Sequence, residues 1–214
     1  MKILALDTTG EFGSIALAVD GRVVEEVALH SPEGFGHVLF DQVDCLLRRH
    51  KLRLQDIEGY ASASGPGSFT GVRIGLTAAK GLAEANGRRV VAVSNLQALA
   101  SFGARQLRAP VIDARRGEIY GGLYDARLHA VREEVVAPFA KWLAALPEGD
   151  LEIVTSGFEV LAVRFPVTRA PRELAGAIAK IAAARFQAGL AQDPAEIGAN
   201  YVRRPDAELL WREP

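Results

Sequence analysis

The chain has 214 residues, of which 49% are hydrophobic, enough for a packed core in one large domain or two small ones. Its 25 basic and 26 acidic residues give a net charge of −1, so no global field draws it onto nucleic acid. The single cysteine, Cys45, excludes an intrachain disulfide and a cysteine-based metal cluster.

The apolar start of the chain, residues 1–6, ends at Asp7. It is too short for the central region of a signal peptide or for a membrane span. Together with the lone cysteine, this predicts a cytoplasmic protein that does not bind membranes.

The first half of the chain alternates short apolar runs with helical patterns. Asp20-Gly21 predicts a two-residue hairpin turn, because Asp-Gly suits the type of turn whose twist matches that of paired strands. Hydrophobic periodicity then predicts strands at residues 2–7, 13–19, 22–29, 60–63 and 89–93, and helices at 37–50, 68–86 and 95–102.

The second half of the chain begins the same order of strands and helices again. This predicts an α/β protein of two lobes, with the boundary between them near residues 103–108. We expect one lobe over residues 1–105 and another over 106–214, whose tail can return to the first lobe. The pattern predicts strands at residues 110–113, 118–125, 128–136 and 151–155, and helices at 139–146 and 172–192.

The stretch of residues 63–75, Ala-Ser-Gly-Pro-Gly-Ser-Phe-Thr-Gly-Val-Arg-Ile-Gly, joins a strand to a long helix. Ser68 is placed to cap that helix, and Gly87 stands where a left-handed residue ends one. Gly71, Gly75 and Ala79 recur every fourth residue and form one smooth stripe. Because glycine costs about 1 kcal/mol in a helix interior, the stripe predicts that another backbone, helix or ligand comes very close.

This stretch resembles the signature of the TsaB (YeaZ) family. Three further segments resemble that family in the same order: residues 3–9 (Ile-Leu-Ala-Leu-Asp-Thr-Thr), 113–120 (Asp-Ala-Arg-Arg-Gly-Glu-Ile-Tyr) and 201–203 (Tyr-Val-Arg). The resemblance implies an actin/hexokinase/Hsp70-like fold (ASKHA, ribonuclease H-like) with two similar βββαβαβα-type lobes, in agreement with the repeated order of elements.

Asp7, Thr8, Thr9 and Gly10 form the turn after the first predicted strand. In ATP-using proteins of the superfamily that the resemblance implies, this hairpin holds phosphates, so one interpretation is a degenerate phosphate site for ATP or ADP. The other is that the side chains only satisfy the amides of the turn. The amides and hydroxyls of the loop at residues 65–70 could bind an anion, but its glycines also suit close packing, and we favour packing.

Metal binding has little support in the sequence. The related catalytic subunit TsaD carries two histidines four residues apart on a helix, and no two of the four histidines here have that spacing. His37 and Asp41 are four apart, but a solvated helix start explains them better. We therefore predict no metal site, no catalytic residue and no glycoprotease-like peptidase activity. Cys45, beside Leu46 in an amphipathic helix, is interpreted as a core or interface thiol.

Two basic segments can be interpreted in two ways. Residues 113–116, Asp-Ala-Arg-Arg, could hold a phosphate or an RNA backbone, but a salt-linked turn is favoured. The tail residues Arg203, Arg204, Trp211 and Arg212 could contact RNA or a partner, although such small clusters usually form plain surface.

The helices at residues 37–50 and 68–86 are the favoured partner surface. Small or apolar residues surround most of the second helix, so we expect it to be covered on more than one side. The family is known to pair through these helices, and we expect Gly75→Leu or Ala79→Arg to break pairing while leaving the fold intact. The predicted interface residues are Leu39, Val43, Leu46, Leu47, Gly71, Val72, Gly75, Leu76, Ala79 and Leu82.

The resemblance implies a non-catalytic scaffold that dimerises with a TsaD-like catalytic subunit, which would hold any metal. That complex would install the threonylcarbamoyl group on the adenosine next to the anticodon, in tRNAs that read codons beginning with A. A TsaE-like ATPase would join it, tRNA would be bound indirectly, and the chain alone would form a homodimer. The alternative is an independent ATP-dependent phosphotransferase of the ASKHA superfamily, although the second half lacks a glycine-rich adenosine loop.

Overall fold

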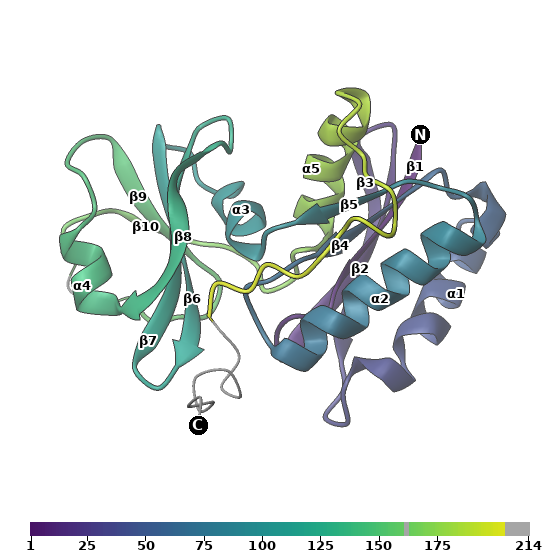
Figure 1. The fold of residues 1–214 in the computed structure, drawn as a ribbon, viewed down its shortest axis with the longest axis horizontal. Coiled ribbons are helices and arrows are strands. Elements are labelled where there is room, and N and C mark those ends of the chain that lie inside the picture. Colours follow the sequence, from purple (N-terminus) through teal and green to yellow (C-terminus); the bar gives the residue numbers. More distant parts are fainter. Residues whose placement is uncertain (161–162, 204–214) are drawn as a thin grey trace, which may run out of the picture.

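The computed structural model describes residues 1–160 and 163–203. The first lobe contains a five-stranded sheet and three α-helices (Figure 1). In chain order its elements are β1 (Lys2–Asp7), β2 (Phe12–Val19), β3 (Arg22–His30), η1 (Phe35–His37), α1 (Leu39–Arg49), η2 (Leu54–Asp56), β4 (Gly59–Ala63), α2 (Phe69–Ala85), β5 (Val90–Val93) and α3 (Asn95–Ala100).

In its described residues, 106–160 and 163–203, the second half of the chain supplies a second five-stranded sheet and two more helices. Its elements are β6 (Leu107–Arg115), β7 (Glu118–Asp125), β8 (Ala130–Pro138), α4 (Phe139–Ala144), β9 (Leu151–Thr155), β10 (Val167–Arg169) and α5 (Ala175–Gln187). The sequence pattern does not predict β10, which has only three residues and follows β9 without a helix in the described part of that connection.

The two sheets have the same topology. The first has the order β3-β2-β1-β4-β5, and the second has the order β8-β7-β6-β9-β10 when it is read from its other edge. In both, three antiparallel strands are followed by two strands parallel to the first. This repeat confirms the α/β, ASKHA-like fold with two similar lobes.

The local turn and cap signals act as the sequence predicts. Asp20 and Gly21 have φ values of 50° and 76° in the hairpin between β2 and β3. Ser68 accepts a hydrogen bond of 3.2 Å from the amide of Gly71 and caps α2, and Gly87 has a φ of 59° after the helix. These positions fix where the strands turn and where α2 begins and ends.

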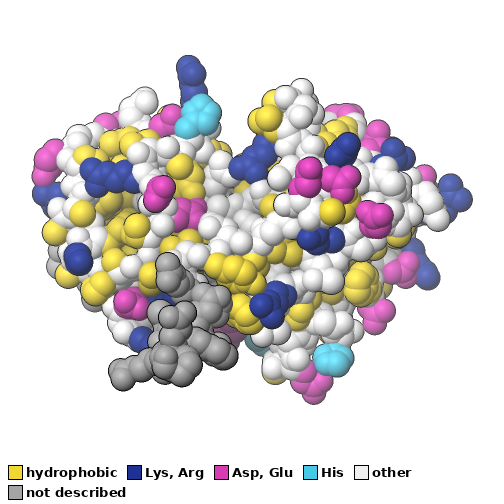
Figure 2. All heavy atoms as spheres, viewed as in Figure 1, with side chains coloured by type: hydrophobic (Ala, Val, Ile, Leu, Met, Phe, Trp, Pro, Cys, Tyr) yellow, Lys and Arg dark blue, Asp and Glu magenta, His cyan; other side chains and the backbone are white. Residues whose placement is uncertain are grey.

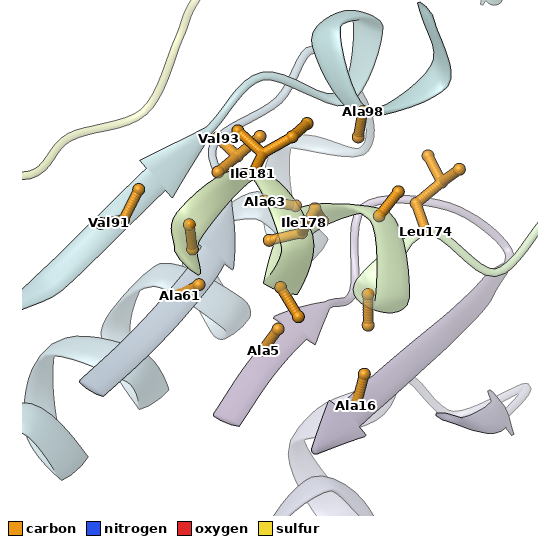
Figure 3. Packing of buried hydrophobic residues seen from close by; sticks show 14 of the residues in the cluster. Ala5, Ala16, Ala61, Ala63, Val91, Val93, Ala98, Leu174, Ile178 and Ile181 are labelled. Carbon is orange, nitrogen blue, oxygen red and sulfur yellow. The ribbon is translucent and has the colours of Figure 1, made fainter. Parts of the chain in front are cut away.

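The last helix, α5, is shorter than the predicted 172–192 and packs on the sheet of the first lobe (Figures 1 and 3). It ends at Gln187, because Gly189 just beyond it has a φ of 71° and the amides of Gly189 and Leu190 bond back to the last turn. Alanines lie on both sides of this contact and let the helix backbone come close to the strands. They include Ala5, Ala16, Ala61 and Ala63 of the sheet and Ala175, Ala179 and Ala182 of α5.

The opposite face of the same sheet is covered by α1 and α2. Because side chains alternate along a strand, Ile3 and Ala5 point to α5, whereas Leu4 and Leu6 belong to the core under α1 and α2. The first sheet is therefore buried between helices on both faces. The hairpin after β1 and the start of α2 are joined directly, because the amide of Ser68 donates to the carbonyl of Thr9 at 2.7 Å.

Candidate functional site: a helix groove and an interlobe cleft

An apolar groove of about 500 Å³ lies on the outer side of α1 and α2. Phe40 and Phe69 are 55% and 44% exposed there, although large aromatic side chains are usually buried. Figure 2 shows hydrophobic side chains and a basic group together on the surface over the N-terminal end of α2. The lining residues are Gly36, Leu39, Phe40, Phe69, Thr70, Arg73, Ile74, Thr77, Ala78, Gly81 and Leu82.

Most of the residues predicted for the partner interface lie beneath this groove rather than on it. Of the predicted residues only Leu39 and Leu82 line the groove, and Leu82 is partly buried. The others are buried on the inner sides of α1 and α2: Val43, Leu46, Leu47, Gly71, Val72, Gly75, Leu76 and Ala79. The use of this helix pair by a partner stays a prediction. At the level of single residues, however, the exposed side chains of the two helices are others, chiefly Phe40, Phe69 and Arg73.

The glycine stripe of α2 faces the hairpin after β1, not a partner. A Cβ at Gly71 would lie 2.0 Å from the carbonyl oxygen of Thr8, and one at Gly75 would lie 2.7 Å from the Thr8 hydroxyl. That hydroxyl donates a 2.6 Å hydrogen bond to the carbonyl of Gly71. The expectation that Gly75→Leu leaves the fold intact is therefore wrong, because no side chain fits there. Ala79 is fully buried, so arginine there would also disturb the core.

Side chains of the predicted phosphate turn hydrogen-bond within the turn itself. Asp7 is only 3% exposed, and its Oδ1 accepts hydrogen bonds from the amide (3.0 Å) and the hydroxyl (2.7 Å) of Thr9. Burial raises the pKa of the Asp7 carboxyl above its ordinary value of 3.8, and the Thr9 and Asn95 hydrogen bonds only partly oppose this. This geometry agrees with the interpretation that Asp7 satisfies an amide of the turn, whereas the Thr8 hydroxyl donates to the carbonyl of Gly71 in α2 instead.

Asn95 completes this turn, and it is not among the residues predicted for the site. Its side-chain amide donates to the Thr9 hydroxyl at 2.7 Å, and its Oδ1 accepts from the amide of Gly65 at 3.0 Å. Asn95 is buried, and it joins the hairpin after β1 to the Gly65 loop. The sequence signal was only indirect, because Ser94 could be recognised as the cap of α3 but Asn95 carries no motif.

A cleft of about 490 Å³ separates the two lobes. Thr9, Gly10 and Ser68 line its first-lobe side, whereas Asp7 and Thr8 do not line it. On the opposite side of the cleft, within the second lobe, the amide of Arg115 donates a 2.8 Å hydrogen bond to the Asp113 carboxylate. The lining of the second lobe comprises Val111, Ile112, Asp113, Ala114, Arg115, Tyr120, Ser156, Gly157 and Phe158.

The segment of residues 113–116 is a tight turn, as favoured by the sequence. Arg115 and Arg116 have φ values of 64° and 57°, and the Arg115 guanidinium lies 3.7 Å from the Asp113 carboxylate. Arg203 reaches this region from the tail, because its guanidinium donates to the carbonyl of Ala114 at 2.9 Å and pairs with Glu118. The other tail candidates, Arg204, Trp211 and Arg212, lie outside the described residues.

The remaining candidate residues are exposed. His37 is the exposed last residue of η1 and Asp41 lies on the exposed first turn of α1. Within residues 1–160 and 163–203, no group of three or more metal-ligating side chains gathers. Cys45 is also exposed, on the outer face of α1, so of its two interpretations the core thiol is wrong and the interface thiol stays a prediction. No helix of the described chain is long and apolar enough to cross a membrane.

Comparison with known proteins identifies the family. The family model described as TsaD, tRNA N6-adenosine threonylcarbamoyltransferase, matches residues 34–211. The tRNA threonylcarbamoyladenosine biosynthesis protein TsaB of Bacillus subtilis is 36% identical over 165 residues, which cover 74% of this chain and 72% of that protein. The chain belongs to the TsaB/YeaZ family. It also falls within the wider family that the TsaD model describes.

Other members of the TsaB/YeaZ family agree with this assignment. The Escherichia coli TsaB protein is 40% identical over 128 residues, which cover 58% of this chain and 55% of that protein. The structure of YeaZ from Pseudomonas aeruginosa superposes with a TM-score of 0.79 at 27% identity, and the match covers 94% of this chain and 99% of that one. Both lobes therefore follow the family fold.

Proposed function

We propose that this TsaB/YeaZ family member takes part in tRNA threonylcarbamoyladenosine biosynthesis as a non-catalytic subunit that dimerises with a TsaD-like catalytic subunit. The relatives' names support the pathway. The observation that carries the subunit role is the exposed apolar groove of α1 and α2, rimmed by Phe40 and Phe69. Exposed aromatic side chains around a preformed groove are typical of protein–protein interfaces.

In this proposal the partner transfers the threonylcarbamoyl group to the adenosine next to the anticodon of tRNAs that read codons beginning with A. Any metal would belong to the partner, a TsaE-like ATPase would act in the same complex, and tRNA would reach this chain through the complex. A homodimer through the same groove would compete with the partner, because both would cover Phe40 and Phe69.

An independent phosphotransferase is the weaker proposal. Such an enzyme would need the Asp7 carboxylate ionised and directed into the cleft, to position a metal or to accept a proton. Asp7 is instead buried, accepts hydrogen bonds from Thr9 and Asn95, and does not line the cleft. These residues do not fit a phosphate-bound metal, so we propose that the chain needs no ATP or ADP of its own.

The test is reconstitution with the TsaD-like protein of the same organism, a tRNA substrate and threonylcarbamoyl adenylate. Nucleoside analysis by mass spectrometry should detect threonylcarbamoyladenosine when both proteins are present, and little when either is omitted. Phe40→Ala with Phe69→Ala should lower the product by at least tenfold, whereas Leu190→Ala, an exposed residue outside the groove, should not. Equal product without this chain, or ATP hydrolysis by the chain alone, would contradict the proposal.

A further inference from the structure

An ordered aromatic and arginine cluster borders the groove. The guanidinium carbon of Arg73 lies 3.8 Å from the centre of the Phe69 ring, and the Tyr201 ring lies 5.6 Å from the same ring. Arg73 Nε donates a 3.2 Å hydrogen bond to the Tyr201 hydroxyl. Arg73 and Phe69 line the groove, so the late Tyr-Val-Arg segment supports one of its walls.

Tyr201 is held in place from both sides along the chain. The amide of Asn200 donates to the carbonyl of Ser64 at 2.7 Å, in the first lobe. Two residues after Tyr201, the Arg203 guanidinium donates to the carbonyl of Ala114 in the second lobe. Because Tyr201 and Phe69 are thereby fixed, Arg73 is oriented before any partner arrives, which reduces the entropy that binding would cost.

Arg73 keeps binding capacity that the described chain does not use. Its Nε is bonded to Tyr201, but no carboxylate of the described residues lies within 4 Å of its guanidinium, and its terminal nitrogens donate no hydrogen bond to them. A guanidinium has five donors in a planar fork that matches a carboxylate. Its position on an apolar groove therefore favours a ligand that is apolar and carries one acidic group.

We propose that Arg73, oriented by Phe69 and Tyr201, selects the partner of the groove by binding a carboxylate on an apolar helix of the TsaD-like subunit. This inference rests on the proposed function. A helix fits because the groove runs between two helices, and ridges of a third helix pack into such grooves. The TsaD family model matches the region that contains α1 and α2, so a TsaD-like partner carries segments equivalent to this helix pair.

The test is calorimetric titration of the full chain into the TsaD-like protein at low and high salt. We expect Arg73→Gln to raise the dissociation constant at least tenfold and to make it less dependent on salt concentration, because the ion pair is lost. Tyr201→Phe, which keeps the ring but removes the acceptor for Arg73, should weaken binding by a few-fold. The matched control, Arg22→Gln at an exposed position of β3, should bind like the unmodified chain.

The outcomes separate this inference from the proposed function. If the unmodified chain does not bind the TsaD-like protein, the proposed function fails and the inference fails with it. If that chain binds but Arg73→Gln binds within twofold of it, only the inference is overturned. If light scattering shows that Arg73→Gln abolishes self-association while partner binding is unchanged, the groove belongs to a second copy, and the inference is also overturned.

Discussion

At the scale of single residues, Gly71 shows how close the hairpin after β1 lies to the start of α2. The Thr8 hydroxyl donates to the Gly71 carbonyl, and the Thr8 carbonyl occupies the place that a Cβ of residue 71 would need. A backbone carbonyl cannot move as a flexible side chain can. Any side chain at residue 71 would therefore collide with the Thr8 carbonyl, so this helical position needs glycine.

We predict that Gly71→Ala destabilises the protein by at least about 2 kcal/mol, since overpacking against backbone costs about 1–3 kcal/mol. Urea denaturation followed by circular dichroism gives the change in the free energy of unfolding. Gly81→Ala is the matched control in the same helix, because nothing lies within 4 Å of its Cβ position. That control should be neutral or gain up to about 1 kcal/mol from helix propensity; equal effects at both positions would contradict the prediction.

Asp7 gives a prediction about pH. Burial raises the pKa of its carboxyl in the folded protein, so between the ordinary value of 3.8 and the raised value the folded state holds more protons than the unfolded state. Stability from this group is therefore present at low pH and is lost as the pH rises. Asp7→Asn removes the titration, so the unfolding free energy of the unmodified chain should fall relative to Asp7→Asn as the pH rises from 4 to 8. Urea denaturation at four pH values measures this difference; a rise would contradict the prediction.

At the scale of helices and strands, most of the fold could be predicted because periodicity and turn residues are local signals. The strands at residues 118–125 and 151–155 were predicted with the observed bounds, and so was the cap at Ser68. The three-residue β10 was missed, since it is too short to show a period.

The candidate site was less predictable for a physical reason. Helical spacing identifies an apolar face, as with Leu39 and Val43, but not whether the chain's own sheet or a partner covers it. The apolar stripes of α1 and α2 proved to lie in the core, and the exposed Phe40 and Phe69 were not proposed. Contacts such as that of Asn95 with Thr9 join residues 86 apart and leave no local pattern.

The start of α5 depends on residues from the first sheet. The amide of Ala175 donates to the Ser14 hydroxyl at 2.9 Å, and the amide of Gly176 donates to the Glu26 carboxylate at 2.8 Å. No side chain of the helix's own N-cap residue, Leu174, performs this role. Two strands thus cap a helix that follows them by about 150 residues, and they fix where α5 begins on the sheet.

We predict that Ser14→Ala destabilises the protein by about 1–2 kcal/mol, the usual cost of a lost cap at a buried helix start. The reason is that the Ala175 amide would lose its acceptor in a place that is closed to water. Thermal and urea denaturation measure the loss. Ser31→Ala is the control, because the Ser31 hydroxyl makes no hydrogen bond to the described chain; a loss at Ser31 as large as that at Ser14 would contradict the prediction.

At the scale of the whole molecule, Glu134 joins the two lobes. Its carboxylate, on β8, accepts hydrogen bonds from the hydroxyls of Ser94 and Tyr124 and, at 2.5 Å, from the side-chain amide of Asn200. Ser94 belongs to the first lobe and Tyr124 to the second, while Asn200 belongs to the segment that holds Tyr201 beside the groove. Burial and the adjacent Glu134 raise the pKa of Tyr124, so its hydroxyl remains a donor.

We predict that Glu134→Ala loosens the lobes because three donors lose one acceptor. The unfolding free energy should fall by about 1–3 kcal/mol, and amide hydrogen exchange should increase at Ser64–Gly67 and at Asn200–Arg203, with little change in α1. Mass spectrometry of exchanged peptides measures this pattern. The neighbouring exposed Glu133→Ala is the matched control. Exchange that is alike in the two variants would mean that the lobes are joined elsewhere. Increased exchange confined to Glu134→Ala would mean that one carboxylate couples the cleft to the segment beside the groove.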